Sequence, residues 1–318
     1  MAALPQAQRN KSLLLLFFRK VEPSLPSEHA PVSRIAYVNG QYRPHSDAAI
    51  HIEDRGFQFA DGVYEVVYMR NGRLIDRDLH MDRLDRSLRE LSITQPMSRG
   101  ALLCVMAEVA RQNRLRDGLI YMQITRGTAA RNHVFPKPGT AATLVVTMRR
   151  TPAFPKSPDA WAVSAITHAD ERWARCDIKS VALLPNVLAR EAARTQGAAE
   201  AILFDANNNI TEGAATTAWM VDAAGTLITR PLSHAILPGC TRAALLAELA
   251  TSNVTLEERL FTLQDLRAAR EIFITAATTF VKPVTKLDGV AVGDGRVGAV
   301  TRLMFDLIAR HVQADAAG

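Results

Sequence analysis

The chain has 318 residues, of which 48% are hydrophobic and 22% are charged, as in a soluble globular protein with room for two domains. A formal net charge of +6 is small for this length, and no block of about five like charges occurs, so nucleic acid is not an expected partner. Cys104, Cys176 and Cys240 form no C-x-x-C pair, and no run reaches the length of a membrane span. We therefore expect a cytoplasmic protein with no disulfide framework, no metal site and no membrane segment.

Residues 1–33 form an extension that we expect to be disordered. Its apolar run at residues 13–18 is shorter than the core of a signal peptide, and Arg19 and Lys20 follow it instead of a cleavage site. The lack of acidic residues before Glu22 gives the extension a faint likeness to a transit peptide. We favour a disordered extension or an upstream start codon over a targeting segment.

Two β-hairpins are predicted in the first half of the chain. Asn39-Gly40 and Asn71-Gly72 each separate two apolar runs, which is a strong hairpin signal. Residues 53–62 lie between them and are polar with glycines, so we expect a connecting loop that could carry function. Helices are predicted over residues 80–91 and from residue 99, because their apolar residues recur at intervals of three and four.

Strands predicted at residues 119–125 and 142–148 flank a loop at residues 126–136. The loop contains Arg131 and His133. Arginine offers a planar fork that fits a carboxylate bidentately, and a nearby histidine can add another donor. The loop is therefore a candidate carboxylate clamp, although basic loops are more often simply solvated.

The proline-rich residues 151–159 are the predicted linker between a small α/β domain, residues 34–150, and a larger α/β domain, residues 160–318. Strands and helices alternate in the larger domain. The strands are expected at residues 161–167, 200–204, 217–221, 226–229 and 271–275, and the helices at residues 186–194, from residue 239, and at the C-terminal end.

Lys179 is a candidate nucleophile. It follows a short strand-like run and precedes the predicted helix at residues 186–194, so it lies where an element ends rather than on a solvated face. A lysine that is desolvated, or close to another cation, has a lowered pKa and can attack a carbonyl to form a Schiff base. Taken alone this signal is weak, since most lysines are surface charges.

A candidate phosphate site lies farther along the chain. Gly239, Cys240 and Thr241 open a predicted helix, where unpaired backbone amides and a hydroxyl suit an anion, although they also fit an ordinary helix start. Ala276 and Ala277 follow a predicted strand and could supply further amides.

Glu212 lies between a turn and a strand, beside Gly213. A carboxylate there could hold the protonated nitrogen of a pyridine ring, or it could be a solvated turn residue. An amine, a carboxylate and a phosphate site are the three groups that pyridoxal 5'-phosphate requires. The three features together favour this cofactor.

These motifs resemble those of the fold type IV pyridoxal-phosphate enzymes, and among them the D-amino acid aminotransferases. The resemblance extends from about residue 34 to the C-terminal end, and its motifs occur in the family's order. They are Glu53-Asp54-Arg55-Gly56, Asp61-Gly62-Val63-Tyr64-Glu65, His80-Met81-Asp82-Arg83-Leu84, Arg175-Cys176-Asp177-Ile178-Lys179-Ser180, Thr211-Glu212-Gly213 and Leu237-Pro238-Gly239-Cys240-Thr241-Arg242. The implied fold is a small α/β domain followed by a larger α/β domain with a pseudo-barrel.

The resemblance also implies a role for each matching residue. Lys179 would hold the cofactor and shuttle the catalytic proton, and Glu212 would pair with the pyridine nitrogen. The expected cofactor contacts also include Leu237 on one ring face and a phosphate site formed by Arg83, Gly239, Cys240, Thr241, Ala276 and Ala277. Ala277 replaces a hydroxyl residue that relatives often carry, which costs one neutral hydrogen bond of about 0.5–1.5 kcal/mol, so binding should survive.

The substrate carboxylate is expected to bind Tyr64, Arg131 and His133, the last two from the neighbouring subunit of a homodimer. The arginine–histidine pair resembles the D-amino acid enzymes and is absent from the L-branched-chain and amine transaminases. The implied reaction is amino transfer from D-alanine or D-glutamate to pyruvate or 2-oxoglutarate. The alternatives are a 4-amino-4-deoxychorismate lyase, an L-branched-chain or (R)-amine transaminase, and a binding protein that has the fold without the chemistry.

Overall fold

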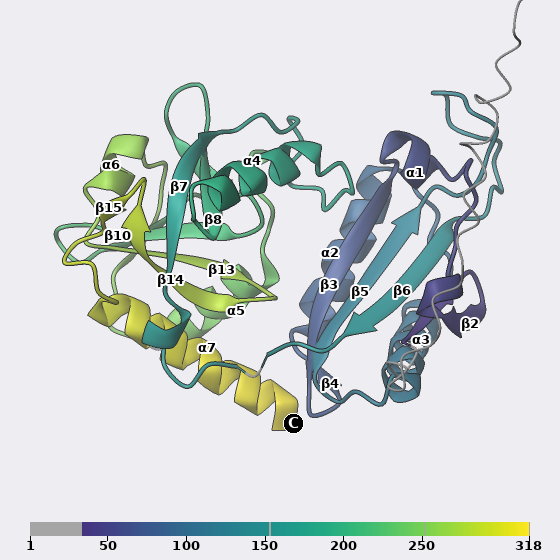
Figure 1. Ribbon diagram of the computed structural model, residues 1–318, viewed down its shortest axis with the longest axis horizontal. Helices are drawn as coiled ribbons and strands as arrows, with labels where there is room; N and C mark the ends of the chain where they lie inside the picture. The colour runs from purple at the N-terminus through teal and green to yellow at the C-terminus, as the bar shows by residue number, and fades with distance from the viewer. Residues whose placement is uncertain (1–33, 153, 251, 318) are drawn as a thin grey trace, which may run out of the picture. The chain divides into compact units, whose positions relative to one another are not determined.

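Two β-sheets organise the chain and use separate stretches of it (Figure 1). The computed structural model describes residues 34–318 except residues 153, 251 and 318. The extension at residues 1–33, predicted to be disordered, lies outside the described residues. Residues 34–318 form one compact unit.

The first sheet is antiparallel, with the strand order β2-β1-β6-β5-β3-β4. Both Asn-Gly pairs form the predicted hairpin turns, with positive φ at Asn39 and Gly40 and at Asn71 and Gly72. The strands are β1 (Ile35–Val38), β2 (Gln41–Pro44), β3 (Gly62–Arg70), β4 (Arg73–Leu74), β5 (Gly118–Thr125) and β6 (Thr143–Arg149). A 3₁₀ turn at His45–Asp47 follows β2.

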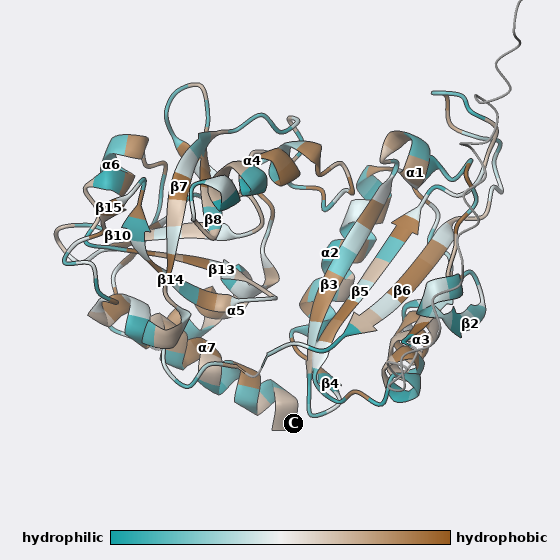
Figure 2. Ribbon diagram, viewed as in Figure 1, coloured by the Kyte–Doolittle hydropathy of each residue, from teal (hydrophilic) through white to brown (hydrophobic). Residues whose placement is uncertain are grey.

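Helices α2 (Arg77–Glu90) and α3 (Arg99–Gln112) match the two predicted helices. Their apolar residues pack with the largely hydrophobic strands β5 and β6 (Figure 2) into one core that includes Leu84, Met106 and Val146. The predicted loop at residues 53–62 was only partly right. It contains the short helix α1 (Arg55–Phe59), because the Asp54 side chain caps it by accepting from the Gly56 amide at 2.8 Å.

The second sheet is mixed, with the order β12-β11-β10-β13-β14-β7-β8-β9 and β15 paired to β14. Strand β7 is parallel to both β14 and β8. The strands are β7 (Val163–Ala169), β8 (Glu200–Phe204), β9 (Ile210–Gly213), β10 (Thr217–Val221), β11 (Leu227–Thr229), β12 (Leu256–Glu258), β13 (Glu271–Ala276), β14 (Phe280–Leu287) and β15 (Val290–Ala291).

The helices of this second half are α4 (Leu184–Thr195), α5 (Cys240–Leu249), α6 (Leu263–Arg267) and α7 (Ala299–Ala317), with a 3₁₀ turn at Asp159–Trp161. A shared hydrophobic cluster joins α5 and α7 to both sheets: Tyr68 and Leu119 of the first sheet pack there with Phe280 and Phe305. The division into domains at residues 151–159 stays a prediction, since the two sheets share this core. Among the described residues, no helix has the length and apolarity needed to cross a membrane.

His311 links α7 to two other helices. Its Nε2 lies 2.8 Å from Oδ1 of Asp76, which precedes α2, and its Nδ1 lies 3.2 Å from Oε1 of Glu248 on α5. The hydrogen bond to Asp76 is the main reason why the pKa of His311 rises from 6.5 to about 9. The folded protein therefore holds a proton on this ring that the unfolded chain releases at lower pH.

We expect the free energy of unfolding to fall as the pH rises from 6.5 to about 9, because the His311 contribution is complete below the unfolded pKa and is lost above the folded one. Urea unfolding at intervals across this range, compared with His311→Gln, measures the effect. The His311→Gln protein should lack this part of the pH dependence. Parallel pH profiles for the two proteins would contradict the assignment.

Candidate active site

The segment around Lys179 is attached to the first sheet by backbone hydrogen bonds. The Lys179 carbonyl accepts from the Tyr64 amide at 3.0 Å, and the Val181 amide donates to the Gly62 carbonyl at 3.0 Å. An isolated β-bridge joins Ser180 to Val63. The predicted strand-like run before Lys179 was wrong, because residues 170–178 follow a turned path without strand pairing.

Side chains hold that turned path in place of a strand ladder. Asp177 is buried and accepts from Arg175 through both carboxylate oxygens, at 2.9 and 3.0 Å. Arg86 of α2 donates to the same carboxylate and, at 2.8 Å, to the Asp177 carbonyl. The two arginines therefore fix the backbone two residues before Lys179.

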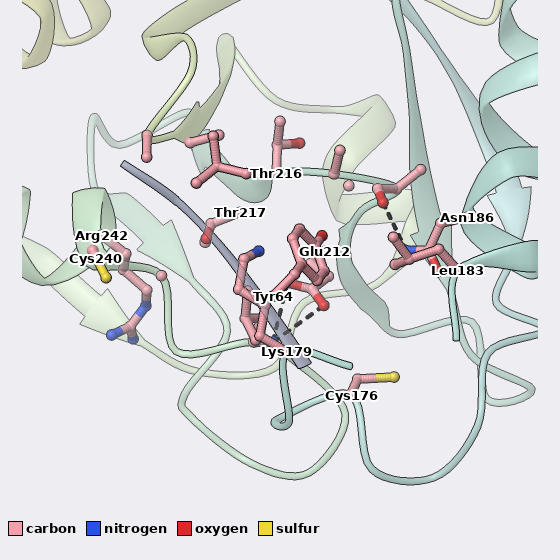
Figure 3. A pocket seen from close by; sticks show the side chains of 18 of the residues that line it. Tyr64, Cys176, Lys179, Leu183, Asn186, Glu212, Thr216, Thr217, Cys240 and Arg242 are labelled. Atoms are coloured by element: carbon pink, nitrogen blue, oxygen red, sulfur yellow. Dashed lines mark hydrogen bonds between the residues drawn. The ribbon is translucent and has the colours of Figure 1, made fainter. Parts of the chain in front are cut away.

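Lys179 lines a cavity of about 240 Å³, together with residues from both halves of the chain (Figure 3). Its Nζ lies 4.4 Å from the centre of the Tyr64 ring. Ten of the twelve predicted site residues line this cavity: Tyr64, Arg83, Lys179, Glu212, Leu237, Gly239, Cys240, Thr241, Ala276 and Ala277. The fold thus gathers residues that are as much as 213 positions apart, from Tyr64 to Ala277, around one space.

Glu212 belongs to strand β9 and is not the turn-to-strand boundary residue that was predicted. Its buried carboxylate accepts from Arg172, and both of its oxygens accept from the Leu237 amide, at 3.1 and 3.2 Å. Burial raises the pKa of Glu212, and the Arg172 guanidinium acts against that rise. Two carboxylate oxygens offer about four acceptor positions, so Oε2 can still accept a donor from the cavity.

Arg172 is a site residue that the sequence reading missed. It pairs with Asp170 at 2.7 Å as well as with Glu212, and it lines the cavity. Asp170 also accepts from the Thr211 hydroxyl at 2.7 Å. The Asp170-x-Arg172 pair lies in the sequence shortly before Lys179, but nothing in that spacing indicates that Arg172 reaches β9.

The N-terminus of α5 forms the candidate phosphate site. Gly239 is the N-cap and has no side chain to occupy the first free amides of the helix. Thr241 is only 2% exposed, so bulk water does not reach its side chain. Its buried Oγ1 nevertheless has no hydrogen-bond partner among the described residues. Burial raises the pKa of the adjacent Cys240 thiol to about 12, so the thiol stays neutral. An orphaned hydroxyl beside free amides fits a phosphate group.

Arg83 lies at the same end of the cavity but is held by protein groups. Its Nε and Nη2 both donate to Glu65 at 2.8 Å, and its Nη1 donates to the Pro238 carbonyl at 3.0 Å. His80 also contacts Glu65, at 2.8 Å. Burial acts to raise the pKa of Glu65, but Arg83 and His80 outweigh it and hold the pKa below its usual range. A guanidinium has five N–H donors, so Arg83 keeps donors for a further anion.

Ala276 ends strand β13, and the Thr279 amide donates to its carbonyl at 3.1 Å. Residues 276–279 therefore form a tight turn into β14, beside α5 at the rim of the cavity. Ala277 offers the turn a backbone amide without a side-chain donor, as the sequence indicates.

Arg131 and His133 do not line the cavity. Both are exposed, and both contact Phe59 of α1: the Arg131 guanidinium lies 4.7 Å from the ring centre, and the two rings lie 5.3 Å apart. Arg55 fixes their loop by donating to the Asn132 carbonyl at 2.6 Å. Within a single chain, the predicted carboxylate clamp is therefore separate from the Lys179 cavity.

The chain matches the family described as amino-transferase class IV over residues 62–287. A D-alanine aminotransferase of Listeria innocua is 36% identical over 276 residues, covering 86% of this chain and 95% of that protein. A D-alanine aminotransferase of Bacillus licheniformis is 39% identical over 265 residues, covering 83% and 92%.

Solved structures show the same fold. The branched-chain amino acid aminotransferase of Escherichia coli superposes with a TM-score of 0.78 at 24% identity, covering 86% of this chain and 92% of that one. A hypothetical aminotransferase from Mycobacterium tuberculosis, in its PLP-bound form, gives 0.75 at 22% identity, covering 88% and 99%. The fold is that of a class IV aminotransferase, which confirms the predicted fold type. The chain belongs to the class IV aminotransferase family.

Proposed function

We propose that this chain is a pyridoxal 5'-phosphate-dependent D-amino acid aminotransferase. It moves the amino group of a D-amino acid, such as D-alanine or D-glutamate, to a 2-oxo acid, such as pyruvate or 2-oxoglutarate. The observation that carries the proposal is the single cavity in which Lys179, the buried carboxylate of Glu212 and the orphaned hydroxyl of Thr241 meet. Relatives named D-alanine aminotransferase, at 36% and 39% identity, support the choice of reaction.

The residues of the cavity fit the cofactor by their donor set. Thr241 and the first amides of α5 would hold the phosphate, and Glu212 would hold the protonated ring nitrogen, with Leu237 against one face of the ring. When bound, the cofactor supplies an electron sink for the bonds at the substrate α-carbon.

The chain's own part of the reaction rests on Lys179. Its Nζ would hold the cofactor, and as a free amine it would take the proton from the substrate α-carbon and later give that proton up. Tyr64 keeps this amine oriented, since its ring lies against Nζ at 4.4 Å. The surrounding apolar wall, including Val66 and Ile178, limits the access of water.

A homodimer is the second part of the proposal. Four large apolar side chains next to the Arg131 loop are exposed, namely Ile52, Phe57, Val134 and Phe135, by 59% to 76%. A surface of this kind is typical of an interface. A second copy covering this surface would bring its Arg131 and His133 to the cavity.

The cytoplasmic location inferred from the cysteines also stays a prediction.

The function is tested by a half-reaction without an acceptor. The cofactor-loaded protein is mixed separately with D-alanine, L-leucine and (R)-1-phenylethylamine, and its visible spectrum is followed. Loss of the yellow band with D-alanine alone supports the proposal. Loss with L-leucine or the aryl amine would point to the other transaminases, and pyruvate formed from 4-amino-4-deoxychorismate with no amino acceptor would point to the lyase. A protein that binds no cofactor would point to the remaining alternative, a binding protein that has the fold without the chemistry.

Arg131→Ala is expected to raise KM for D-alanine by roughly 10- to 100-fold, because a charge-assisted hydrogen bond to the carboxylate is worth about 1.5–3 kcal/mol. The cofactor should remain bound. Steady-state kinetics measure the effect, and Lys137→Ala on the same exposed loop is the matched control. An unchanged KM would remove Arg131 from the clamp.

Co-expression distinguishes a clamp from the same chain from one supplied by the neighbour. A dimer of two Arg131→Ala chains lacks the carboxylate clamp, and a dimer of two Lys179→Ala chains lacks the catalytic lysine. In a mixed dimer, the subunit with intact Lys179 receives Arg131 from its neighbour only if the clamp acts across the interface. Recovery of activity in the mixed dimer supports the neighbour, and no recovery would place the clamp in the same chain.

A further inference from the structure

A second cavity, of about 540 Å³, is lined by residues at one end of the first sheet. This is the end at which β3 and β6 finish and β5 begins (Figure 1). The wall of the cavity contains four arginines and a single carboxylate: Arg70, Arg114, Arg116, Arg150 and Asp117. They come from three separate stretches of the chain, and the fold brings them together. None of these residues has a part in the aminotransferase site.

Most of this positive charge is not neutralised within the protein. Arg116 donates to the Asn71 carbonyl at 2.9 Å, and Asp117 accepts from the Asn71 amide at 3.1 Å. The side chains of Arg70, Arg114 and Arg150 form no ion pair or hydrogen bond in the part of the chain that the structure describes. By contrast, buried arginines elsewhere, such as Arg83, are paired with carboxylates. Three free guanidinium groups around one hollow form an anion-binding surface.

The inner wall of the cavity adds neutral donors. Thr151 and Tyr68 both line it, and the Thr151 side chain interacts with the Tyr68 hydroxyl. Tyr68 is 7% exposed, and burial raises the pKa of its hydroxyl, so the hydroxyl remains a protonated donor. The two hydroxyls therefore add neutral hydrogen-bonding groups to the arginines of the same cavity.

We propose that this cavity binds a small anion with several negative charges, carried by phosphate or carboxylate groups. Arginine forks suit both groups, since each can accept two parallel N–H donors. Four arginines, of which three are free, require more than one such group for neutralisation. A cavity of about 540 Å³ has the size of a small-molecule site, which favours a compact metabolite over a polymer.

Strand β3 connects this cavity to the active site. Tyr64 and Val66 line the Lys179 cavity, while Tyr68 and Arg70 line the basic one. Residues at intervals of two share one face of a strand, so all four lie on the same face of β3, over a span of about 20 Å. Tyr68 also packs edge-on against Phe280, at 5.0 Å, which begins β14 just after the turn at Ala276. An anion held here therefore contacts β3, the strand whose first half lines the Lys179 cavity.

The test is isothermal titration calorimetry of the cofactor-saturated protein with tripolyphosphate and, separately, with citrate. Saturation with the cofactor keeps the α5 phosphate site occupied. We expect binding of at least one anion, weakened by added salt, and a loss of at least about tenfold for each removed arginine in Arg114→Glu/Arg150→Glu. The matched control, Arg296→Glu/Arg310→Glu, changes the net charge equally at exposed positions outside the cavity and should bind as the wild type does.

Binding of tripolyphosphate alone would identify a phosphorylated ligand, and binding of citrate alone would identify a polycarboxylate. Binding of both anions would mean that the site accepts phosphate and carboxylate groups alike. No binding of either anion by the wild type would overturn the proposal, as would equal affinity in the Arg114→Glu/Arg150→Glu protein. Circular dichroism and the cofactor spectrum establish that this variant is folded. If it is not folded, Arg114→Gln/Arg150→Gln replaces it, with the same expected loss.

Discussion

Replacing Lys179 by alanine is expected to lower kcat for D-alanine and 2-oxoglutarate by at least about a thousandfold. Proton transfer by a positioned side chain contributes about 10²- to 10⁴-fold, and this lysine would also be the nucleophile. No other lysine lines the cavity in the described structure. Steady-state kinetics with Lys179→Ala, and with Lys179→Arg to retain the charge, measure the loss.

Two observations control this result. Lys286→Ala removes an exposed lysine of β14 and should leave kcat unchanged. The cofactor should still bind to Lys179→Ala without a covalent bond, because Thr241, the first amides of α5 and Glu212 remain, so its absorbance should accompany the protein on a desalting column. Near-normal turnover by Lys179→Ala would refute the assignment.

Local patterns predicted most of the elements around the cavity. The two Asn-Gly hairpins, helices α2 and α3 and strands β5, β6, β8, β10 and β13 lie where the sequence indicated. Each of these depends on contacts between residues close in the chain, such as the positive φ angles that an Asn-Gly turn requires. The residues around the cavity could be named mainly because their motifs resemble those of a known family.

Strand β14 was not predicted, and its sequence explains why. Pro283 lies in the middle of the strand and has no amide to donate, which normally excludes a central position. Pro283 pairs with Phe273 of β13, whereas pairing with β7 begins only at Val284 and is then irregular up to Lys286. The proline therefore sits where the strand has one neighbour, and no local signal reveals this.

The carboxylate network around Glu212 was likewise beyond local patterns. Arg172 contacts Glu212 forty positions away, and Asp170 contacts Thr211 over forty-one. These pairs exist because the turned segment before Lys179 passes along β9. A single sequence carries no record of that path, so Glu212 could be interpreted only as a carboxylate beside a turn, and Arg172 could not be identified.

Glu212→Gln is expected to reduce kcat by about a hundredfold while the cofactor stays bound. The substitution keeps the size of the side chain but removes the negative charge that would hold a protonated ring nitrogen, and placed charges of this kind contribute about 10²- to 10³-fold. The fold should tolerate the change, since Arg172 keeps its bidentate partner Asp170, at 2.7 and 2.9 Å.

The matched control is Asp170→Asn, which removes one negative charge from the same network but leaves the carboxylate of Glu212 facing the cavity. Both variants remove one of the two carboxylates that pair with Arg172. The kcat of Asp170→Asn should nevertheless fall much less than that of Glu212→Gln. Kinetics and urea unfolding of the two proteins separate the effects. Equal losses of kcat would mean that Glu212 acts only by pairing with Arg172, and a larger loss for Glu212→Gln at similar stability would place its charge at the cofactor ring.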